Sequence, residues 1–272
     1  MAGSKILFLD LDQTLLRDDK SVSEKNCEAI HNALKHGHYI VLATGRPVDS
    51  GRKVVKKLGL SQLGCYMIAY NGGLIYDCAA DKVLIEHTMS IEDVEYLFQK
   101  AWEDNLYIQT YTQNYIITRK RTRETQYYID QTGMECKVGD VASVITDEPH
   151  KVLLIDLEDH GKLLQFKEKH AEWAKKHSEC FFSSPQYLEY CPKGINKGSG
   201  VEYICKLLNV KKENTIGVGD EENDIPLLQQ TAIGIAVKNA SDVLKQVADF
   251  VTEHDNNEDA VAEVIEKYIL PR

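Results

Sequence analysis

The sequence lacks the features that would direct a protein to a membrane, a nucleic acid or an oxidising compartment. No apolar run approaches the ~20 residues that span a bilayer, and the first apolar stretch, 6–9, is stopped by Asp10 and Asp12 rather than extended into a signal peptide. Basic residues number 32 against 42 acidic ones, and the net charge of −10 disfavours unassisted binding to nucleic acid or anionic lipid. The seven cysteines contain no CxxC pair, which predicts reduced thiols in a cytoplasmic protein.

Three common motifs of enzyme families are also missing. The sequence contains no Walker A motif, no GxGxxG and no G-x-S-x-G, so nucleoside triphosphatase, dehydrogenase and α/β-hydrolase functions have no support. No internal repeat or low-complexity linker is present either. What remains is a chain of 272 residues, 43% hydrophobic and 27% charged, which is ordinary for a globular protein of one large or two modest domains.

The two ends of the chain alternate short apolar runs with amphipathic stretches. Short buried runs bounded by turn residues predict strands, and stretches with apolar residues at helical spacing predict helices. Alternation of the two predicts an α/β core with a Rossmann-like parallel sheet and right-handed crossovers. The expected strands are 6–9, 39–43, 65–70, 215–218 and 234–237, and the expected helices are 23–36, 48–58, 197–208, 224–230, 240–248 and 258–268.

The pattern changes between residues 80 and 193. Alternating β-branched and aromatic residues predict strands at 82–88 and 106–119, the latter with a hairpin turn at Gln113-Asn114. Helices are expected at 91–103 and 159–177, a further strand at 151–157, and another strand or a hairpin at 180–190. We therefore expect an inserted α+β cap at 80–193, acting as a substrate-selecting lid, and a catalytic core made of 1–79 and 194–272.

Polar side chains follow three of the buried strands of the core. Asp10 and Asp12 end the first strand, Thr44 ends the second, and Asp220, Glu221 and Asp224 follow the strand at 215–218. Ligands of open parallel sheets bind at the carboxyl ends of the strands, where these side chains would meet. Clustered carboxylates repel each other unless a cation compensates, and oxygen ligands without His or Cys favour Mg²⁺.

Each of these features also has a purely structural interpretation. An Asp after a strand is often a turn residue or a helix cap, and Thr44-Gly45 is ordinary loop sequence. The acidic run after residue 219 would stabilise the first turn of a helix, and a lysine at a helix start such as Lys197 is usually solvated. All of these interpretations would have to hold together, so the joint pattern favours a site.

The motifs DLDQTLL (10–16), LATGR (42–46), the lone Lys197 and GDEEND (219–224) resemble, in this order, the four motifs of the haloacid dehalogenase-like (HAD) phosphatases. NGGLIYD (71–77), NKGSGVEYI (196–204) and GDEENDIPLL (219–228) are similar to the Cof-type branch, whose cap is inserted between the second and third motifs. The resemblance covers roughly residues 1–78 and 190–265.

The resemblance implies a phosphoaspartyl mechanism and a role for each matching residue. Asp10 would be the nucleophile and Asp12 the general acid and base. Mg²⁺ would be bound by Asp10, by Asp220 and by the backbone carbonyl of Asp12. Glu221 or Asp224 would bind it directly or through water. The phosphoryl oxygens would be bound by Thr44, Gly45, Lys197 and Asn223.

One position departs from the family pattern. The residue after the second aspartate is usually Gly in the family, and here it is Gln13. Because Gln favours a negative φ, we expect the loop to take an ordinary backbone conformation at this position.

We therefore expect a cytoplasmic Mg²⁺-dependent phosphatase for a small phosphorylated metabolite, either a sugar phosphate or a nucleotide-related monoester. The alternatives are a phosphomutase with the same intermediate and a non-catalytic protein that binds phosphorylated metabolites. The basic run RKRTR (119–123) is interpreted as a solvated hairpin rim, or alternatively as a contact for nucleic acid or a phosphorylated substrate. No nucleic acid or membrane partner is expected, and the sequence does not indicate the oligomeric state.

Overall fold

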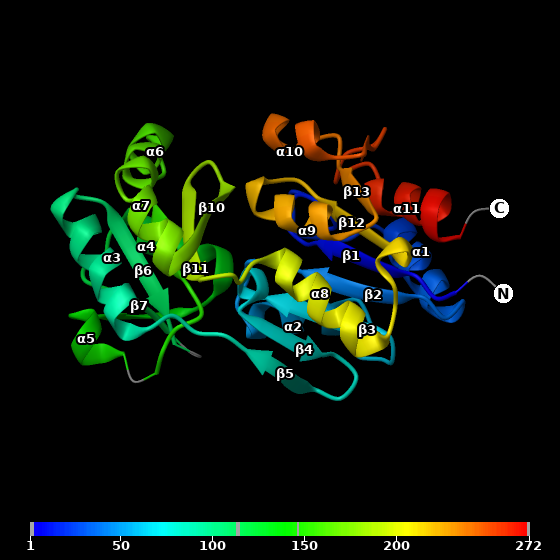
Figure 1. Ribbon diagram of the computed structural model, residues 1–272, viewed down its shortest axis with the longest axis horizontal. Helices are drawn as coiled ribbons and strands as arrows, with labels where there is room; N and C mark the ends of the chain where they lie inside the picture. Colours follow the sequence, from blue (N-terminus) through cyan, green and yellow to red (C-terminus); the bar gives the residue numbers. More distant parts are fainter. Residues whose placement is uncertain (1–2, 113–114, 146, 271–272) are drawn as a thin grey trace. The chain divides into compact units, whose positions relative to one another are not determined.

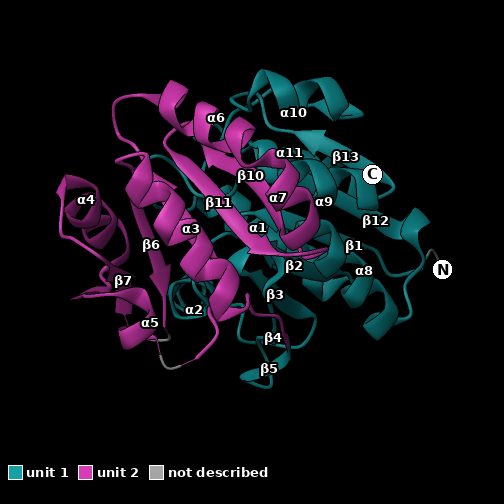
Figure 2. Ribbon diagram, turned by 60° about the vertical axis from the view of Figure 1, so that its left-hand side comes forward, with its two compact units in different colours: residues 1–85, 196–272 teal, residues 86–195 magenta. Residues whose placement is uncertain are grey.

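A computed structural model describes residues 3–112, 115–145 and 147–270 of the chain. The chain divides into two compact units, drawn in different colours in Figure 2. Unit 1 comprises 1–85 and 196–272, and unit 2 comprises 86–195. None of the helices in the described ranges is both long and apolar enough to cross a membrane.

Unit 1 is built on an eight-stranded sheet with the strand order β14-β13-β12-β1-β2-β3-β4-β5 (Figure 1). Strands β14 to β3 of this order pair in parallel, whereas β4 pairs antiparallel with β3. The strands are β1 (Ile6–Asp10), β2 (Tyr39–Ala43), β3 (Cys65–Ala69), β4 (Leu74–Asp77), β5 (Lys82–Glu86), β12 (Thr215–Gly219), β13 (Ile233–Ala236) and β14 (Phe250–Val251). The predicted α/β fold with a parallel sheet core is confirmed.

Apolar sequence accounts for the strands at the centre of this sheet. Every residue of β1 is buried, which is why its first four residues, 6–9, are all apolar instead of alternating. The helices of unit 1 are α1 (Glu24–Lys35), α2 (Val48–Lys57), α8 (Lys197–Leu208), α9 (Ile225–Gln230), α10 (Asp242–Val247) and α11 (Ala260–Val264), with short turns η1 (Tyr70–Gly72), η2 (Lys212–Asn214), η3 (Glu222–Asp224) and η4 (Ile265–Ile269). Helices α8 and α9 pack on each other, as do α1 and α11.

Unit 2 has its own six-stranded sheet with the order β10-β11-β9-β6-β7-β8. Its strands are β6 (Tyr107–Tyr111), β7 (Tyr115–Thr118), β8 (Glu135–Val138), β9 (Val152–Ile155), β10 (Ser178–Ser184) and β11 (Tyr187–Pro192). Its helices are α3 (Ile91–Glu103), α4 (Arg123–Thr132), α5 (Val141–Val144), α6 (His160–Lys169) and α7 (Ala171–His177). The sheet and helices enclose a separate apolar core, centred on residues such as Phe98, Leu154 and Tyr190.

Three details differ from the sequence-based expectations. Strand β5 extends the sheet of unit 1, so the first boundary follows Ile85 rather than residue 79. The helix expected at 159–177 is interrupted at His170, which ends α6 and precedes α7. Helix α4 is not predicted, because two of its three buried residues, Glu124 and Thr125, are polar. It is delimited by a capping box at Thr122 and by Gly133 in the left-handed conformation. The expected turn at Gln113-Asn114 lies outside the described residues.

Candidate active site

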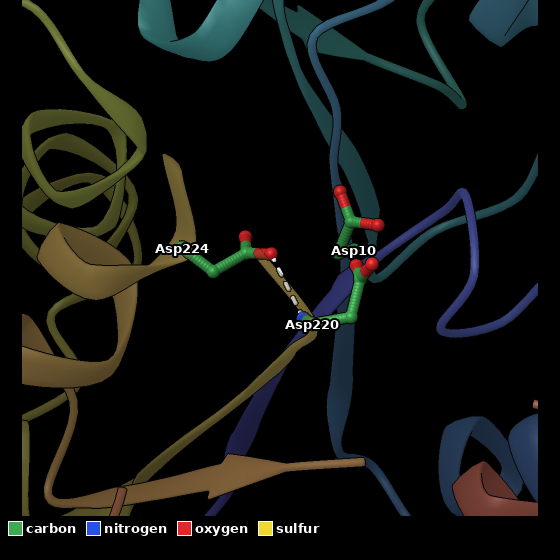
Figure 3. A group of neighbouring side chains, drawn as sticks. All are labelled: Asp10, Asp220 and Asp224. Carbon is green, nitrogen blue, oxygen red and sulfur yellow. Dashed lines mark hydrogen bonds between the residues drawn. The ribbon is translucent and has the colours of Figure 1, made fainter. Parts of the chain in front are cut away.

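Three carboxylates meet at the carboxyl ends of two adjacent strands of unit 1. Asp10 is the last residue of β1, Asp220 follows β12, and Asp224 ends η3. Because β1 and β12 pair in parallel, with Leu9 opposite Val218, both strands deliver their next residues to the same edge of the sheet. One oxygen from each carboxylate lies within 4.8 Å of the others, and all three residues are buried (Figure 3). The convergence predicted for Asp10 and Asp220 is therefore present, and Asp224 joins it.

Lys197 holds two of these carboxylates together. It is the first residue of α8 and is fully buried, and its Nζ lies 2.5 Å from Asp10 Oδ1 and 2.6 Å from Asp224 Oδ1. The interpretation of Lys197 as a solvated lysine is therefore wrong. A cation is unfavourable at the start of a helix. Two charged hydrogen bonds compensate for this cost at Lys197.

Backbone groups and small side chains fix the other ends of the carboxylates. Thr14 Oγ1 donates to Asp220 Oδ1 at 3.1 Å, and Asp224 Oδ2 accepts the N–H of Asp220 at 3.1 Å. Gly219 leaves room for this arrangement, because a Cβ there would lie 2.3 Å from Asp224 Cγ. The glycine that ends β12 is thus required by the close approach of a carboxylate to the strand.

Burial makes the cluster unfavourable for negative charge. It raises the pKa of Asp10 to about 7, an effect that the charge of Lys197 reduces and that of Asp224 increases. Burial and the charges of Asp10 and Asp224 likewise raise the pKa of Asp220 well above its ordinary value. The pKa of Lys197 is raised too: burial alone would lower it, but Asp10 and Asp224 outweigh that effect.

The donor set fits a hard divalent cation. Three carboxylates within 4.8 Å of one another offer only oxygen ligands, and a single lysine cannot neutralise them all. Oxygen ligands at this density are typical of Mg²⁺ sites. The residues present are therefore compatible with the metal that the motifs imply.

Asp12 lies apart from this group and has cationic partners of its own. Arg46 contacts both of its carboxylate oxygens, with Nε 2.6 Å from Oδ2 and the terminal nitrogen Nη2 2.7 Å from Oδ1. Lys20 Nζ donates to Oδ1 at 2.9 Å. Burial would raise the pKa of Asp12, but Arg46 and Lys20 lower it to about 2. In this arrangement Asp12 is ionised, so it has to take up a proton before it can act as a general acid.

The sequence-based site did not include these two cations. Arg46 comes two residues after Thr44, at the end of the strand next to that of Asp12. Its positive charge at this edge of the sheet was the signal that could have identified it as a partner of the carboxylates. Lys20 offered no such signal, because it lies eight positions after Asp12 and only the folded loop brings it back.

Thr44 and Asn223 are linked through the turn after β3. Thr44 is buried and follows Ala43, the residue paired with Asp10. Its carbonyl oxygen accepts the N–H of Asn71 at 3.0 Å, and the side chain of Asn223 donates to Asn71 Oδ1 at 3.1 Å. Gly45, the next residue, is partly buried. Two of the predicted phosphate-binding residues, Thr44 and Asn223, are thus connected through Asn71.

Glu221 caps the turn η3, next to Asp224. Its side chain accepts the N–H of Glu222 at 3.3 Å and forms a capping box with Asp224 at η3. Burial raises its pKa above the ordinary value. Glu221 is not one of the three carboxylates whose oxygens converge, so its expected part in metal binding stays a prediction.

A glycine in η1, the turn after β3, positions the start of the helix that carries Lys197. Gly72 has φ +110°, and a Cβ on it would lie 2.3 Å from the carbonyl oxygen of Asn196. Asn196 is the N-cap of α8, and its side chain accepts the N–H of Ser199 at 3.1 Å. The sequence marked this region only as a turn; the structure adds that the turn packs directly against the start of the helix that carries Lys197.

The prediction that Gln13 has an ordinary backbone conformation is wrong. Gln13 has φ +59°, the left-handed conformation that a glycine would adopt at little cost. Asn239 Nδ2 donates to the Gln13 carbonyl at 2.8 Å, and Asn239 Oδ1 accepts the N–H of Asn256 at 3.1 Å. Asn256 Nδ2 in turn donates to the Leu16 carbonyl at 3.1 Å. Contacts from the C-terminal part of the chain therefore hold a conformation that Gln disfavours by itself.

Comparisons with known proteins found a matching family and similar structures. A family model for haloacid dehalogenase-like hydrolases matches residues 7–265. The 5-amino-6-(5-phospho-D-ribitylamino)uracil phosphatase YcsE of Bacillus subtilis is 29% identical over 98% of this chain and 96% of its own length. A solved haloacid dehalogenase-like hydrolase from Bacteroides thetaiotaomicron has a TM-score of 0.84 at 29% identity, covering 97% of this chain and 99% of that one. The HAD subclass IIB sugar phosphatase BT4131 has a TM-score of 0.83 over the same shares, and at 21% identity it shows the fold alone.

Proposed function

Because the chain belongs to the haloacid dehalogenase-like hydrolases and is a phosphoric monoester hydrolase, we propose that it hydrolyses a small phosphorylated metabolite through an aspartyl phosphate on Asp10. The observation that carries this proposal is the buried contact of Lys197 with Asp10 and Asp224, beside Asp220. These groups come from three separate segments of the chain, around residues 10, 197 and 220–224. A fold that needed only stability would not bury three carboxylates around a single lysine.

In the first step the free oxygen of Asp10 attacks phosphorus. Lys197 occupies Oδ1, so we assign the attack to Oδ2. The new bond joins Oδ2 to phosphorus and the bond from phosphorus to the alcohol oxygen breaks. Asp12, which has to take up a proton from solvent before this step, donates that proton to the alcohol oxygen. In the second step Asp12 takes a proton from water, the water oxygen bonds to phosphorus, and the Asp10 carboxylate leaves with its electron pair. Splitting hydrolysis in this way replaces one slow step by two easier ones.

The approach of an anionic carboxylate to an anionic ester requires positive charge at the site. Asp10, the carbonyl of Asp12, Asp220 and Asp224 would hold Mg²⁺, with Glu221 as a further ligand directly or through water. When bound, the ion neutralises phosphoryl charge as a Lewis acid. Lys197, the Thr44 hydroxyl, the Gly45 N–H and the Asn223 side chain would bind the phosphoryl oxygens and orient the ester.

The substrate class that we propose is a sugar phosphate or a nucleotide-related monoester. The name of the Bacillus subtilis relative joins both kinds of group, a phosphorylated ribityl chain and a uracil. We further propose that unit 2 selects the substrate, because it is inserted between the segments that supply Thr44 and Lys197. The absence of a nucleic acid partner and the cytoplasmic location stay predictions from the sequence.

Phosphate release tests the function directly. We expect the protein to release inorganic phosphate from an aryl phosphate and from some members of a metabolite panel in Mg²⁺, and to lose this activity in excess EDTA. Adding Mg²⁺ back should restore it, which separates chelation from unfolding. Full activity in EDTA would contradict the assignment of the carboxylates to a metal. Free phosphate from a hexose 1-phosphate identifies a phosphatase, whereas an isomeric hexose phosphate would identify the alternative phosphomutase.

The contacts of Asp12 predict a change in pH dependence for Arg46→Gln. Arg46 lowers the pKa of Asp12, so its removal should raise that pKa, and the base form would be lost at a higher pH. With an aryl phosphate, whose leaving group departs without a proton, we expect the acid limb of kcat to move upward by roughly one pH unit or more. The measurement is kcat against pH.

A matched control for this prediction is Arg52→Gln. Arg52 lies on α2 and pairs with Asp49 and Asp81 instead of Asp12. Its replacement should leave the acid limb in place. An unchanged limb in Arg46→Gln would show that Asp12 does not act as the base in the rate-limiting step.

A further inference from the structure

We propose that unit 2 carries a second ligand site, a pocket beside the RKRTR run that binds a small metabolite combining a planar ring with a phosphate. The pocket is a cavity of about 380 Å³, a size that accommodates a nucleoside monophosphate. It is lined from the last turn of α3, the start of β6, the end of β7 and the start of α4. Every lining residue belongs to unit 2, so the pocket shares no side chain with the Asp10 cluster.

The lining of this pocket has an excess of positive charge. Arg119, Lys120, Arg123 and Lys162 line it, against two carboxylates, Glu124 and Asp156. Both carboxylates are already engaged: Glu124 accepts from Arg123 Nε at 2.8 Å, and Asp156 accepts from Lys162 Nζ at 3.4 Å. In a chain of net charge −10, this local excess of cations favours an anionic ligand.

Two of these cations are the ones best placed to meet a ligand anion. Lys120 is exposed, and within the described ranges no carboxylate pairs with its ammonium group. Arg119 reaches Asp140 only at 3.7 Å. The first turn of α4 adds N–H groups at the same place, because Arg123 and Glu124 begin that ten-residue helix and also line the pocket.

Trp102 offers a surface for the planar part of the ligand. This residue lines the pocket and is 59% exposed, which is unusual for a large aromatic side chain. The Arg119 guanidinium lies 5.8 Å from the centre of its ring. The second tryptophan of the chain, Trp173, is instead stacked on Tyr96 at 4.3 Å. An exposed indole beside an arginine offers a flat surface on which a nucleobase-like ring can stack.

The pocket also gives the RKRTR run a use other than a solvated rim. Arg119, Lys120 and Arg123, three of its four cations, line the pocket, and Arg121 does not. The run therefore supplies most of the positive charge of the pocket. Because the cavity is limited in size, a small molecule fits it better than a polymer does.

The test measures binding of AMP to full-length Asp10→Asn protein by titration calorimetry in EDTA, so that the ligand is not consumed. Adenosine and inorganic phosphate are titrated separately to supply the ring and the anion alone. We expect AMP to bind with a Kd about tenfold lower or more than either part, because both the indole and the cations contribute. Comparable Kd values for AMP and for phosphate would overturn the planar half of the proposal.

Two surface variants locate the binding. Trp102→Ala and Lys120→Glu should each raise the Kd for AMP by about fivefold or more. Lys175→Glu, on an exposed position of α7 outside the pocket, should leave the Kd unchanged. All three positions are exposed, so these variants should fold. Failure of AMP to bind, or equal affinity in Lys120→Glu, would overturn the site.

This outcome is independent of the proposed phosphatase activity. Trp102→Ala and Lys120→Glu, made in the otherwise unaltered chain, should release phosphate from an aryl phosphate at the rate of the unaltered protein. Loss of AMP binding with normal phosphate release therefore speaks only to the pocket. Absent phosphate release in every protein, the unaltered one included, would speak only to the proposed function.

Discussion

Replacing Asp10 by asparagine is expected to reduce phosphate release by about 10⁴-fold or more, as removal of a nucleophile does in other covalent mechanisms. An amide cannot form the aspartyl phosphate, although it has the shape of the carboxylate and its oxygen can still accept from Lys197. Asp224 remains to pair with Lys197, so the packing around β1 should persist. The measurement is steady-state phosphate release from an aryl phosphate in Mg²⁺, and undiminished turnover would exclude Asp10 as the nucleophile.

The same variant should be more stable than the unaltered protein when no metal is present. The pKa of Asp10 is raised from 3.8 to about 7 in the folded state, so ionisation costs stability. This cost is absent at low pH, grows as the pH rises through that interval, and reaches its full size above about 7. Asparagine does not ionise, so in EDTA its Tm should exceed that of the unaltered protein at pH 8 but not at pH 4.

A matched control for this stability effect is Glu172→Gln. Glu172 is exposed on α7, and removal of its charge should change Tm little at either pH. An equal gain in Tm for both variants would mean that the stabilisation comes from lower net charge rather than from the buried cluster.

Replacing Lys197 by methionine should cost both activity and stability. Methionine preserves much of the volume of the buried side chain but leaves Asp10 and Asp224 without their shared cation. Breaking a buried ion pair by removal of one partner typically costs about 3–5 kcal/mol. In EDTA we therefore expect a large fall in Tm at neutral pH, together with loss of phosphate release.

Added Mg²⁺ should partly restore the stability of Lys197→Met but not its activity. A divalent cation neutralises the carboxylates, whereas the contact that Lys197 would make with the phosphoryl group stays missing. Lys206→Met is the control: Lys206 lies on the same helix, its side chain is 81% exposed, and its nearest carboxylate is 3.9 Å away. If Mg²⁺ raised the Tm of both variants equally, the ion would not be acting at the cluster.

The sequence was sufficient to predict the parallel sheet of unit 1 and the convergence of Asp10 and Asp220, because both follow from local patterns of apolar and polar residues. Runs such as Ile6–Leu9 are apolar throughout because they are buried on both faces, and this pattern is visible without coordinates. Parallel order then follows from the alternation of strands and helices, and parallel order brings Asp10 and Asp220 to one edge. The resemblance to the HAD phosphatases, which rested on these motifs, is confirmed.

The partners of these residues could not be predicted, because they depend on tertiary contacts. Arg46 pairs with Asp12 across 34 positions in sequence, and no periodicity indicates that pairing. The left-handed Gln13 illustrates the same limit: intrinsic preference argued for a negative φ, and hydrogen bonds from Asn239 to the loop backbone overrode it. Helix α4 was missed because its ends are fixed by Thr122 and Gly133 rather than by an apolar face.

Asn239 and Asn256 are hydrogen-bonded to the backbone of the loop after β1, so a segment with no predicted site residue helps to hold this loop. Asn256 fastens the carbonyl of Leu16 and Asn239 fastens that of Gln13, so both ends of the loop beside Asp12 depend on residues more than two hundred positions later. A shortened chain ending before Asn239 would retain every acidic side chain of the cluster yet leave this loop untethered. In engineered variants the segment 239–256 should therefore be kept intact, because it holds the loop after β1. Fusions or deletions should be placed elsewhere in the chain.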